Sequence, residues 1–81
     1  MNICFLIGKI CGEIQLEFII NSKNTSIAMF DVELLNGSII KVKGYNEIAD
    51  YCYSKLDKNQ TVAIEGRINS KSEIIIEEIY K

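Results

Sequence analysis

Two lysines and a tyrosine alternate along the stretch SIIKVKGYNEIAD, residues 38–50, and their types suit binding chemistry. Successive side chains of a β-strand point to opposite faces, so Lys41, Lys43 and Tyr45 lie on the same face. Ile39 joins them there. Cations can contact phosphates and an aromatic ring can stack on a base, so this face could bind a nucleic acid. An ordinary solvated strand face is the alternative interpretation.

The segment IAMFDVELL, residues 27–35, alternates in the same way and predicts a neighbouring half-buried strand. Its outward residues would be Ile27, Met29, Asp31 and Glu33. Met29 and Ile27 could add apolar contacts to a bound nucleic acid. Asp31 would instead pair with Lys41 and partly neutralise the face, so a solvated surface with a cross-strand ion pair stays open.

The dipeptide Asn36–Gly37 predicts a hairpin between these two strands. A two-residue loop would place Val32 opposite Lys41 and mix core with solvent, because a slip of one residue turns a strand inside out. We therefore expect a three-residue loop, Leu35–Gly37, with a bulge and a left-handed Gly37. The expected cross-strand pairs are Val32 with Ile40, Phe30 with Val42, and Asp31 with Lys41.

The order of predicted elements is three strands, one helix and two strands. Residues 2–20 form the first predicted strand, with an apolar alternation at Ile14, Leu16, Phe18 and Ile20, and a polar turn at Asn21–Ser26 leads to the hairpin described above. A helix is predicted over 46–56, with Asn46 as its N-cap and Asn59 as its left-handed closing residue. The last two predicted strands cover residues 61–68 and 73–80. This order predicts an all-β protein, a five-stranded OB-fold barrel with one α-helix between strands three and four. We expect a single domain over residues 1–81, with Ala28, Phe30, Val32, Ile40, Val42, Val62 and Ile64 buried.

The composition is that of a soluble globular protein. Hydrophobic residues make up 48% and charged residues 25% of 81 residues, and no apolar run is long enough to span a bilayer. No basic and apolar leader opens the sequence, so we expect a cytoplasmic protein without a membrane partner. The net charge of −2 and pI near 5.0 argue against a strong nucleic-acid binder.

Catalytic chemistry finds little support in the residue types. Cys4, Cys11 and Cys52 have no paired spacing and no histidine accompanies them, so we expect reduced thiols in or near the core and no metal site. Cys52 lies in the predicted helix without a local base. The five glycines are scattered and form no phosphate loop. We expect a non-enzyme without cofactor or small-molecule substrate.

Several segments, in order, resemble the OB-fold domain of bacterial single-stranded DNA-binding proteins. NICFLIGKI is similar to the family's opening asparagine, apolar strand and glycine, and IAMFDV to its second strand. GYNEIADYCYSKLDKNQTVAIEGRI is similar to its aromatic residue, helix and following Val-x-Ile-Glu-Gly-Arg strand. The resemblance implies that Tyr45 takes the place of a stacking aromatic and Lys41 that of a cation facing DNA. It also implies association through the first strand.

The sequence departs from that family at the binding face and at the loops. Ile39 stands where the family commonly has a stacking tryptophan, and the DNA-wrapping loops shrink to LNG and INSKSE. We expect the family's acidic-tipped tail to be absent, because the sequence ends at Tyr80–Lys81. The resemblance is to a minimal relative, of the kind carried by phages or mobile elements or of the scale of primosomal replication protein n.

The expected function is weak, sequence-tolerant binding of single-stranded DNA or RNA in replication, repair or mobile-element maintenance. Its expected contacts are Met29, Ile39, Lys41, Lys43, Tyr45 and Arg67, although an ion pair would compete for Arg67. Gly66 beside it is expected to allow close packing or a bend. The rival hypothesis is a protein–protein interaction module of a larger assembly that binds no nucleic acid.

An apolar outer stripe on the first strand predicts a homodimer or higher homo-oligomer. If Cys4, Leu6 and Ile10 face the core, the outward residues are Ile3, Phe5 and Ile7. A strand that is apolar on both faces is usually covered on both. The stripe could also be covered by the chain's own helix or last strand.

Overall fold

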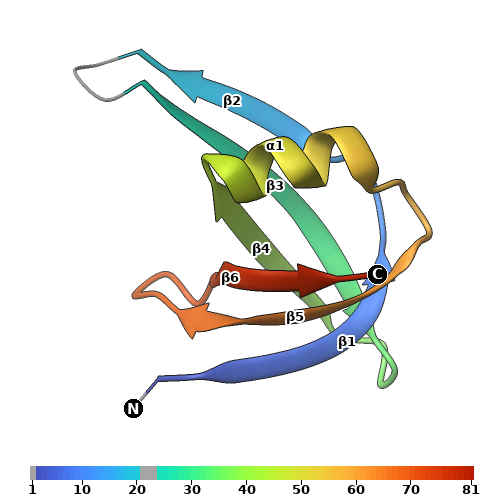
Figure 1. Ribbon diagram of the computed structural model, residues 1–81. Coiled ribbons are helices and arrows are strands. Elements are labelled where there is room, and N and C mark those ends of the chain that lie inside the picture. The colour runs from blue at the N-terminus through green and yellow to red at the C-terminus, as the bar shows by residue number, and fades with distance from the viewer. Residues whose placement is uncertain (1, 21–23) are drawn as a thin grey trace.

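The computed structural model describes residues 2–20 and 24–81, in which strands wrap into a barrel with a helix packed against it (Figure 1). The elements are β1 (Cys4–Ile10), β2 (Gln15–Ile19), β3 (Thr25–Leu34), β4 (Ile39–Tyr45), α1 (Glu47–Lys55), β5 (Thr61–Ile68) and β6 (Ile74–Tyr80). None of the helical structure in these residues has the length and apolar character that crossing a bilayer requires.

The barrel closes because β1 pairs on both of its edges. The strands follow the order β1-β5-β6-β4-β3-β2, and β1 also pairs with β3, which completes the ring. β1 and β2 are consecutive in the chain and are separated by a bend at residues 11–14, where Gly12 has a φ of 108°. Together they are the long first strand that the sequence predicts. The five-stranded OB-fold barrel with a helix between its third and fourth strands is therefore confirmed.

Two glycines allow close approach of backbone segments, Gly8 where the barrel closes and Gly66 between β5 and β6. A Cβ on Gly8 would lie 2.5 Å from Val32 Cγ1 and 2.6 Å from the Glu33 carbonyl oxygen, where β1 crosses β3. A Cβ on Gly66 would collide with the Ile75 carbonyl oxygen, and the β5–β6 register shifts beside this glycine. The expected structural role of Gly66 is thus confirmed.

The β3–β4 hairpin has the predicted register. Its loop is Leu35–Gly37, closed by a hydrogen bond from the Leu34 N–H to the Ser38 carbonyl oxygen at 2.8 Å. Gly37 has a φ of 88°, the left-handed conformation that glycine adopts without strain. The predicted cross-strand pairs are all present: Val32 with Ile40, Phe30 with Val42, and Asp31 with Lys41.

The core fills the barrel with the side chains that alternation predicts, with one exception. Ile40 is only half-buried, because it lies close to the hairpin loop at the end of the barrel. Cys4 and Leu6 are half-buried, whereas Ile10 on the same strand is fully buried. The fully buried members of the expected core are Ala28, Phe30, Val32, Val42, Val62 and Ile64.

The expected apolar face of residues 14–20 is only partly covered. Ile14 and Leu16 are half-buried, but Phe18 and Ile20 are 70% and 89% exposed. The reason is that the outer parts of β2 and β3 extend beyond the barrel, as Figure 1 shows. Of the predicted turn at Asn21–Ser26, Thr25 and Ser26 belong to β3 instead, and residues 21–23 lie outside the described part of the chain.

Helix α1 buries the predicted face but is not capped as expected. Ala49 and Cys52 are fully buried, Ile48 is half-buried, and Leu56 is buried at the C-cap. Asn46 occupies the N-cap position with a φ of 56° and makes no side-chain cap. Its Oδ1 accepts instead from the Ser26 N–H at 3.4 Å.

The predicted helix closure by Asn59 is also wrong. Asn59 has a φ of 73°, yet it lies beyond the C-cap residue Leu56, in the turn that leads to β5. Its N–H donates to the Ile10 carbonyl oxygen at 2.7 Å. The left-handed residue therefore ties this turn to the end of β1.

Candidate nucleic-acid interface

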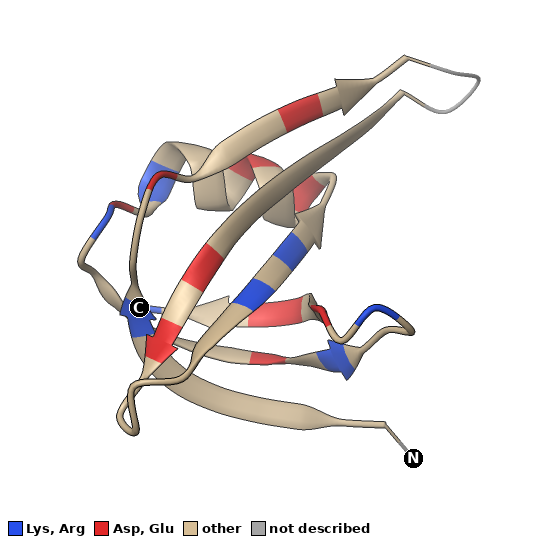
Figure 2. Cartoon of the chain, turned by 180° about the vertical axis from the view of Figure 1, so that it is seen from behind, with Lys and Arg blue, Asp and Glu red and all other residues tan. Residues whose placement is uncertain are grey.

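The outward face of β3 and β4 contains the four residues of β4 that the sequence places there. The cross-strand pairs on this face are Ile27 with Tyr45, Met29 with Lys43, Asp31 with Lys41, and Glu33 with Ile39. Acidic residues of β3 and basic residues of β4 run side by side along it (Figure 2). Ile39 is 62% and Tyr45 is 38% exposed, so both present apolar surface to solvent.

Tyr45 lies at a firmly held point of the barrel. The residue after it, Asn46, donates its backbone N–H to the Ser26 carbonyl oxygen at 2.8 Å and accepts from the Ser26 N–H through its side chain. Asn46 has a positive φ, and the chain turns there directly into α1. Tyr45 therefore lies at the end of β4 that Asn46 hydrogen-bonds to β3, and it pairs across the strands with Ile27.

Lys43 is held by a carboxylate that sequence reasoning missed. Its Nζ lies 3.2 Å from Glu73 Oε2, and the two side chains are only 21% and 14% exposed. Glu73 precedes β6, whose first residues pair in parallel with β4 and so bring the two charges together. No local pattern links residues 43 and 73, because this pairing follows from barrel closure.

The Glu73 carboxylate is itself positioned by the β5–β6 turn. Asn69 Nδ2 donates to Glu73 Oε1 at 2.9 Å, and Asn69 Oδ1 accepts from the backbone N–H groups of Lys71 and Glu73. The Asn69 hydrogen bond, followed by Lys43 and Lys71, lowers the pKa of Glu73 below its usual value. The carboxylate thus stays charged at neutral pH and opposes phosphate binding at Lys43.

Lys41 remains exposed, and its expected ion pair with Asp31 does not form. The two residues lie opposite each other as predicted. Within residues 2–20 and 24–81, however, no ion pair reaches either side chain. Exposed pairs gain little Coulomb energy and must restrict a flexible lysine, so register alone does not form one. The Lys41 ammonium is free to meet an anion.

Arg67 extends the basic surface onto β5. It pairs with Ile75 of β6, and Ile75 in turn pairs with Lys43 of β4. Arg67 and Lys43 are therefore two strand spacings apart, about 10 Å along the hydrogen-bonding direction. Arg67 is exposed, and among the described residues no carboxylate forms the ion pair that was expected to compete for it.

Carboxylates are interspersed with these cations on the same face. Glu17 of β2 lies opposite Ile27, while Asp31 and Glu33 lie on β3 itself (Figure 2). Asp31, opposite Lys41, and Glu33, two residues along the same strand, would repel a phosphate that approaches Lys41, whereas Glu17 lies farther away, beside the pair of Ile27 and Tyr45. This face could hold a single-stranded nucleic acid through one ring and a few cations. The carboxylates on it would limit its affinity for phosphates.

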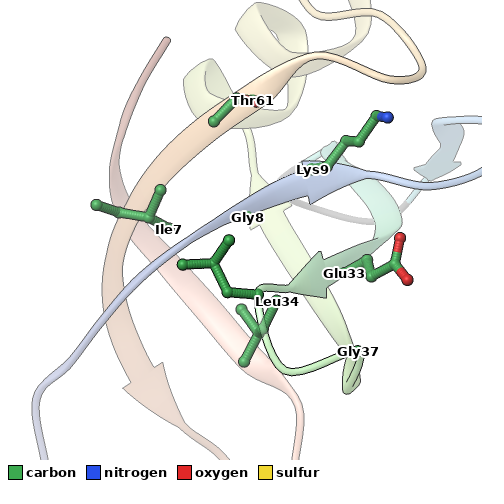
Figure 3. Close-up of a pocket in the computed structure, with 8 residues that line it drawn as sticks. Ile7, Gly8, Lys9, Glu33, Leu34, Gly37 and Thr61 are labelled. Atoms are coloured by element: carbon green, nitrogen blue, oxygen red, sulfur yellow. The ribbon is translucent and has the colours of Figure 1, made fainter.

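The outward side of β1 is an exposed apolar stripe. Ile3, Phe5 and Ile7 are 63%, 61% and 55% exposed, so neither α1 nor β6 covers them. A hollow of about 400 Å³ adjoins the stripe where β1 meets the end of β3 (Figure 3). Ile7 and Leu34 line it, and the fully exposed Leu35 stands at its rim.

The three cysteines are free thiols in or near the core, as expected. Cys4 and Cys11 are half-buried, and burial raises the pKa of the fully buried Cys52 to about 11. Such a thiol is a poor nucleophile at neutral pH. No group of three or more histidine, cysteine, aspartate or glutamate residues in the described part of the chain is placed to hold a metal ion.

Comparison with known proteins gives structural matches alone. The sequence matches no protein-family profile, and no curated protein matches it. The SSB domain of a protein from Synechococcus sp. superposes with a TM-score of 0.87 at 26% identity, covering 100% of this chain and 96% of that one.

More distant sequences share the same fold. The wild-type single-stranded DNA binding protein from Thermus aquaticus matches with a TM-score of 0.88 at 15% identity over 100% of this chain, which spans only 40% of that protein. The mitochondrial single-stranded DNA binding protein from S. cerevisiae matches with a TM-score of 0.81 at 13% identity, covering 96% of this chain and 90% of that one. The chain therefore has the OB fold of single-stranded DNA-binding domains.

Proposed function

We propose that this chain binds single-stranded nucleic acid weakly and without sequence demand, across the outward face of β3 and β4. The observation that carries the proposal is the placement of Tyr45 and Lys41 on one exposed strand face of an SSB-type barrel. Tyr45 would stack on a base, while Ile39 and Met29 would give apolar contact. Lys41 and Arg67 would contact phosphates, with Lys43 available only after it leaves Glu73.

The proposed chemistry is binding rather than catalysis, in the service of replication, repair or mobile-element maintenance. Two cations and one ring predict a short site and an affinity in the micromolar range. With two phosphates neutralised, log K should fall with log salt with a slope of about −1.4. DNA is the proposed ligand because the similar structures are named single-stranded DNA binding proteins. The same titration with a labelled oligo(U) distinguishes RNA from DNA.

A homodimer through the outward face of β1 is proposed alongside this function. Ile3, Phe5 and Ile7 form an apolar stripe, and the hollow beside Ile7 could receive a side chain from a second copy. The same stripe favours the rival function, a protein–protein interaction module in a larger assembly. The two functions differ in whether the β3–β4 face takes up a nucleic acid.

Fluorescence anisotropy with a labelled oligo(dT) at low salt tests the proposed function. We expect saturable binding at micromolar protein, and a flatter salt slope for Lys41→Gln. Lys58→Gln is the matched control, since it removes the same charge from an exposed residue beyond α1. Absence of saturable binding at tens of micromolar protein would reject the nucleic-acid proposal and favour the interaction module.

A further inference from the structure

A polar hollow of about 360 Å³ lies beside Lys41 on the proposed binding face. It is lined by Met29, Phe30 and Asp31 of β3, Gln15 of β2 and Lys41 of β4, and a second carboxylate, that of Glu13, belongs to its lining from the bend before β2. The bend at residues 11–13 forms the remaining wall. This wall is fixed, because the Cys11 N–H donates to the Asp31 carbonyl oxygen at 3.0 Å.

Asp31 belongs to the lining of this hollow, and its carboxylate has no partner among the residues that the structure describes. It is half-buried, and within residues 2–20 and 24–81 no hydrogen bond or ion pair engages its side-chain oxygens. An ionised carboxylate only accepts hydrogen bonds. It therefore repels a phosphate but attracts an amino group, and the group that it selects must belong to a base rather than to the backbone.

Pyrimidine bases differ in what they offer to such an acceptor. Cytosine presents an exocyclic amino group, which carboxylate side chains accept from in protein–DNA complexes. Uracil and thymine present a carbonyl oxygen at that position, and their remaining N–H lies between two carbonyl oxygens that repel a carboxylate. Asp31 thus distinguishes bases that stacking on Tyr45 cannot distinguish, because every base has a π-face.

We propose that Asp31 gives the binding face a preference for bases that carry an exocyclic amino group, so that cytosine is bound more tightly than uracil. This inference rests on the proposed function, since the phosphate of the same nucleotide would lie on Lys41, the cross-strand neighbour of Asp31. Met29 supplies the apolar contact beneath the base.

The test compares oligo(dC) with oligo(dU) of equal length, whose bases differ at position 4 and the adjacent ring nitrogen. Anisotropy titrations at neutral pH should give a dissociation constant for oligo(dC) about three- to tenfold lower than for oligo(dU). Asp31→Asn should abolish this ratio, because an amide can donate as well as accept. The same variant should bind both oligomers more tightly than the native protein does, since a charge that repels phosphate is gone.

Glu33→Gln is the matched control, because it removes the same charge from the same face of β3 at a residue outside the hollow. It should raise both affinities and keep the ratio. Circular dichroism establishes that each variant is folded. Equal affinities for the two oligomers in the native protein, or a preference that survives Asp31→Asn, would overturn the inference and leave the proposed function standing. Failure to bind either oligomer would overturn both.

Discussion

The Lys43 ammonium and the Glu73 carboxylate lie 3.2 Å apart, brought together by the parallel pairing of β4 with the start of β6. The carboxylate occupies the position that a nucleic-acid phosphate would take at this lysine. Because Asn69 holds Glu73 in place, the Glu73 carboxylate would compete with the phosphates of a bound nucleic acid for Lys43. The affinity of this face for the proposed nucleic acid would thus depend on a residue that the nucleic acid need not touch.

Glu73→Gln should strengthen binding of single-stranded DNA. The amide keeps a hydrogen-bond acceptor for Asn69 but releases the Lys43 ammonium to a phosphate. One added phosphate contact steepens the slope of log K against log salt by about 0.7. At about 0.1 M salt this contact raises the affinity about fivefold. The slope from anisotropy titrations over a salt series measures both effects. Glu77→Gln, an equal charge change at an exposed residue of β6, should leave the slope unchanged.

Tyr45→Ala should weaken binding by about 1–3 kcal/mol through the loss of base stacking. The salt slope should stay nearly constant, because no charge changes. Tyr53→Ala is the matched control: this ring is 56% exposed on α1, away from the β3–β4 face. Equal losses for the two variants in the same titration would show that the ring at residue 45 is not a stacking platform.

Phe5→Arg should dissociate a dimer formed through the outward side of β1. The substitution places a charge in the middle of the stripe between Ile3 and Ile7, where a partner would have to bury it. Light scattering at tens of micromolar should give twice the monomer mass for the native protein and the monomer mass for the variant. Tyr53→Arg changes another exposed aromatic residue, at 56% exposure on α1, and should leave the mass unchanged.

The raised pKa of the buried Cys52 thiol predicts that the folded chain loses stability in alkaline solution. Its pKa is raised from 9.0 to about 11 in the folded chain, so the unfolded thiol ionises while the folded thiol keeps its proton. The folded state then binds more protons, and stability falls as pH rises through this window. The two units correspond to about 2–3 kcal/mol in the free energy of unfolding.

Chemical denaturation at intervals across this pH range measures the effect. Cys52→Ala is the reference, because the two proteins share every other ionisable group and those contributions cancel in the difference. The native protein should lose the stated free energy relative to the variant. Parallel pH profiles would contradict the prediction.

Local pattern was enough to predict the β3–β4 face. The alternation over residues 27–45 and the left-handed Gly37 set the register, because a slip would have buried Lys41 and exposed Val42. The Lys43–Glu73 pair could not be predicted in this way. It depends on barrel closure, which joins segments thirty residues apart without any local sequence signal.

Two predictions are wrong because they, too, depend on contacts between segments that are distant in the sequence. The spacing of Phe18 and Ile20 correctly predicts a strand, but burial depends on whether a neighbouring layer reaches that far, and here it does not. The asparagine before α1 has the right type for a cap, yet its side chain meets Ser26 of β3 instead. In both cases a tertiary contact, present or missing, decides what local propensity leaves open.

The position of β2 at the end of the strand order has a consequence for handling the protein. β2 pairs with β3 along one edge, and its other edge is unpaired among the described residues. A strand edge with exposed Phe18 and Ile19 is a template for intermolecular β-pairing and aggregation. Glu17, between Leu16 and Phe18, is the charged residue of this strand, and a charge at such an edge opposes pairing with a second copy.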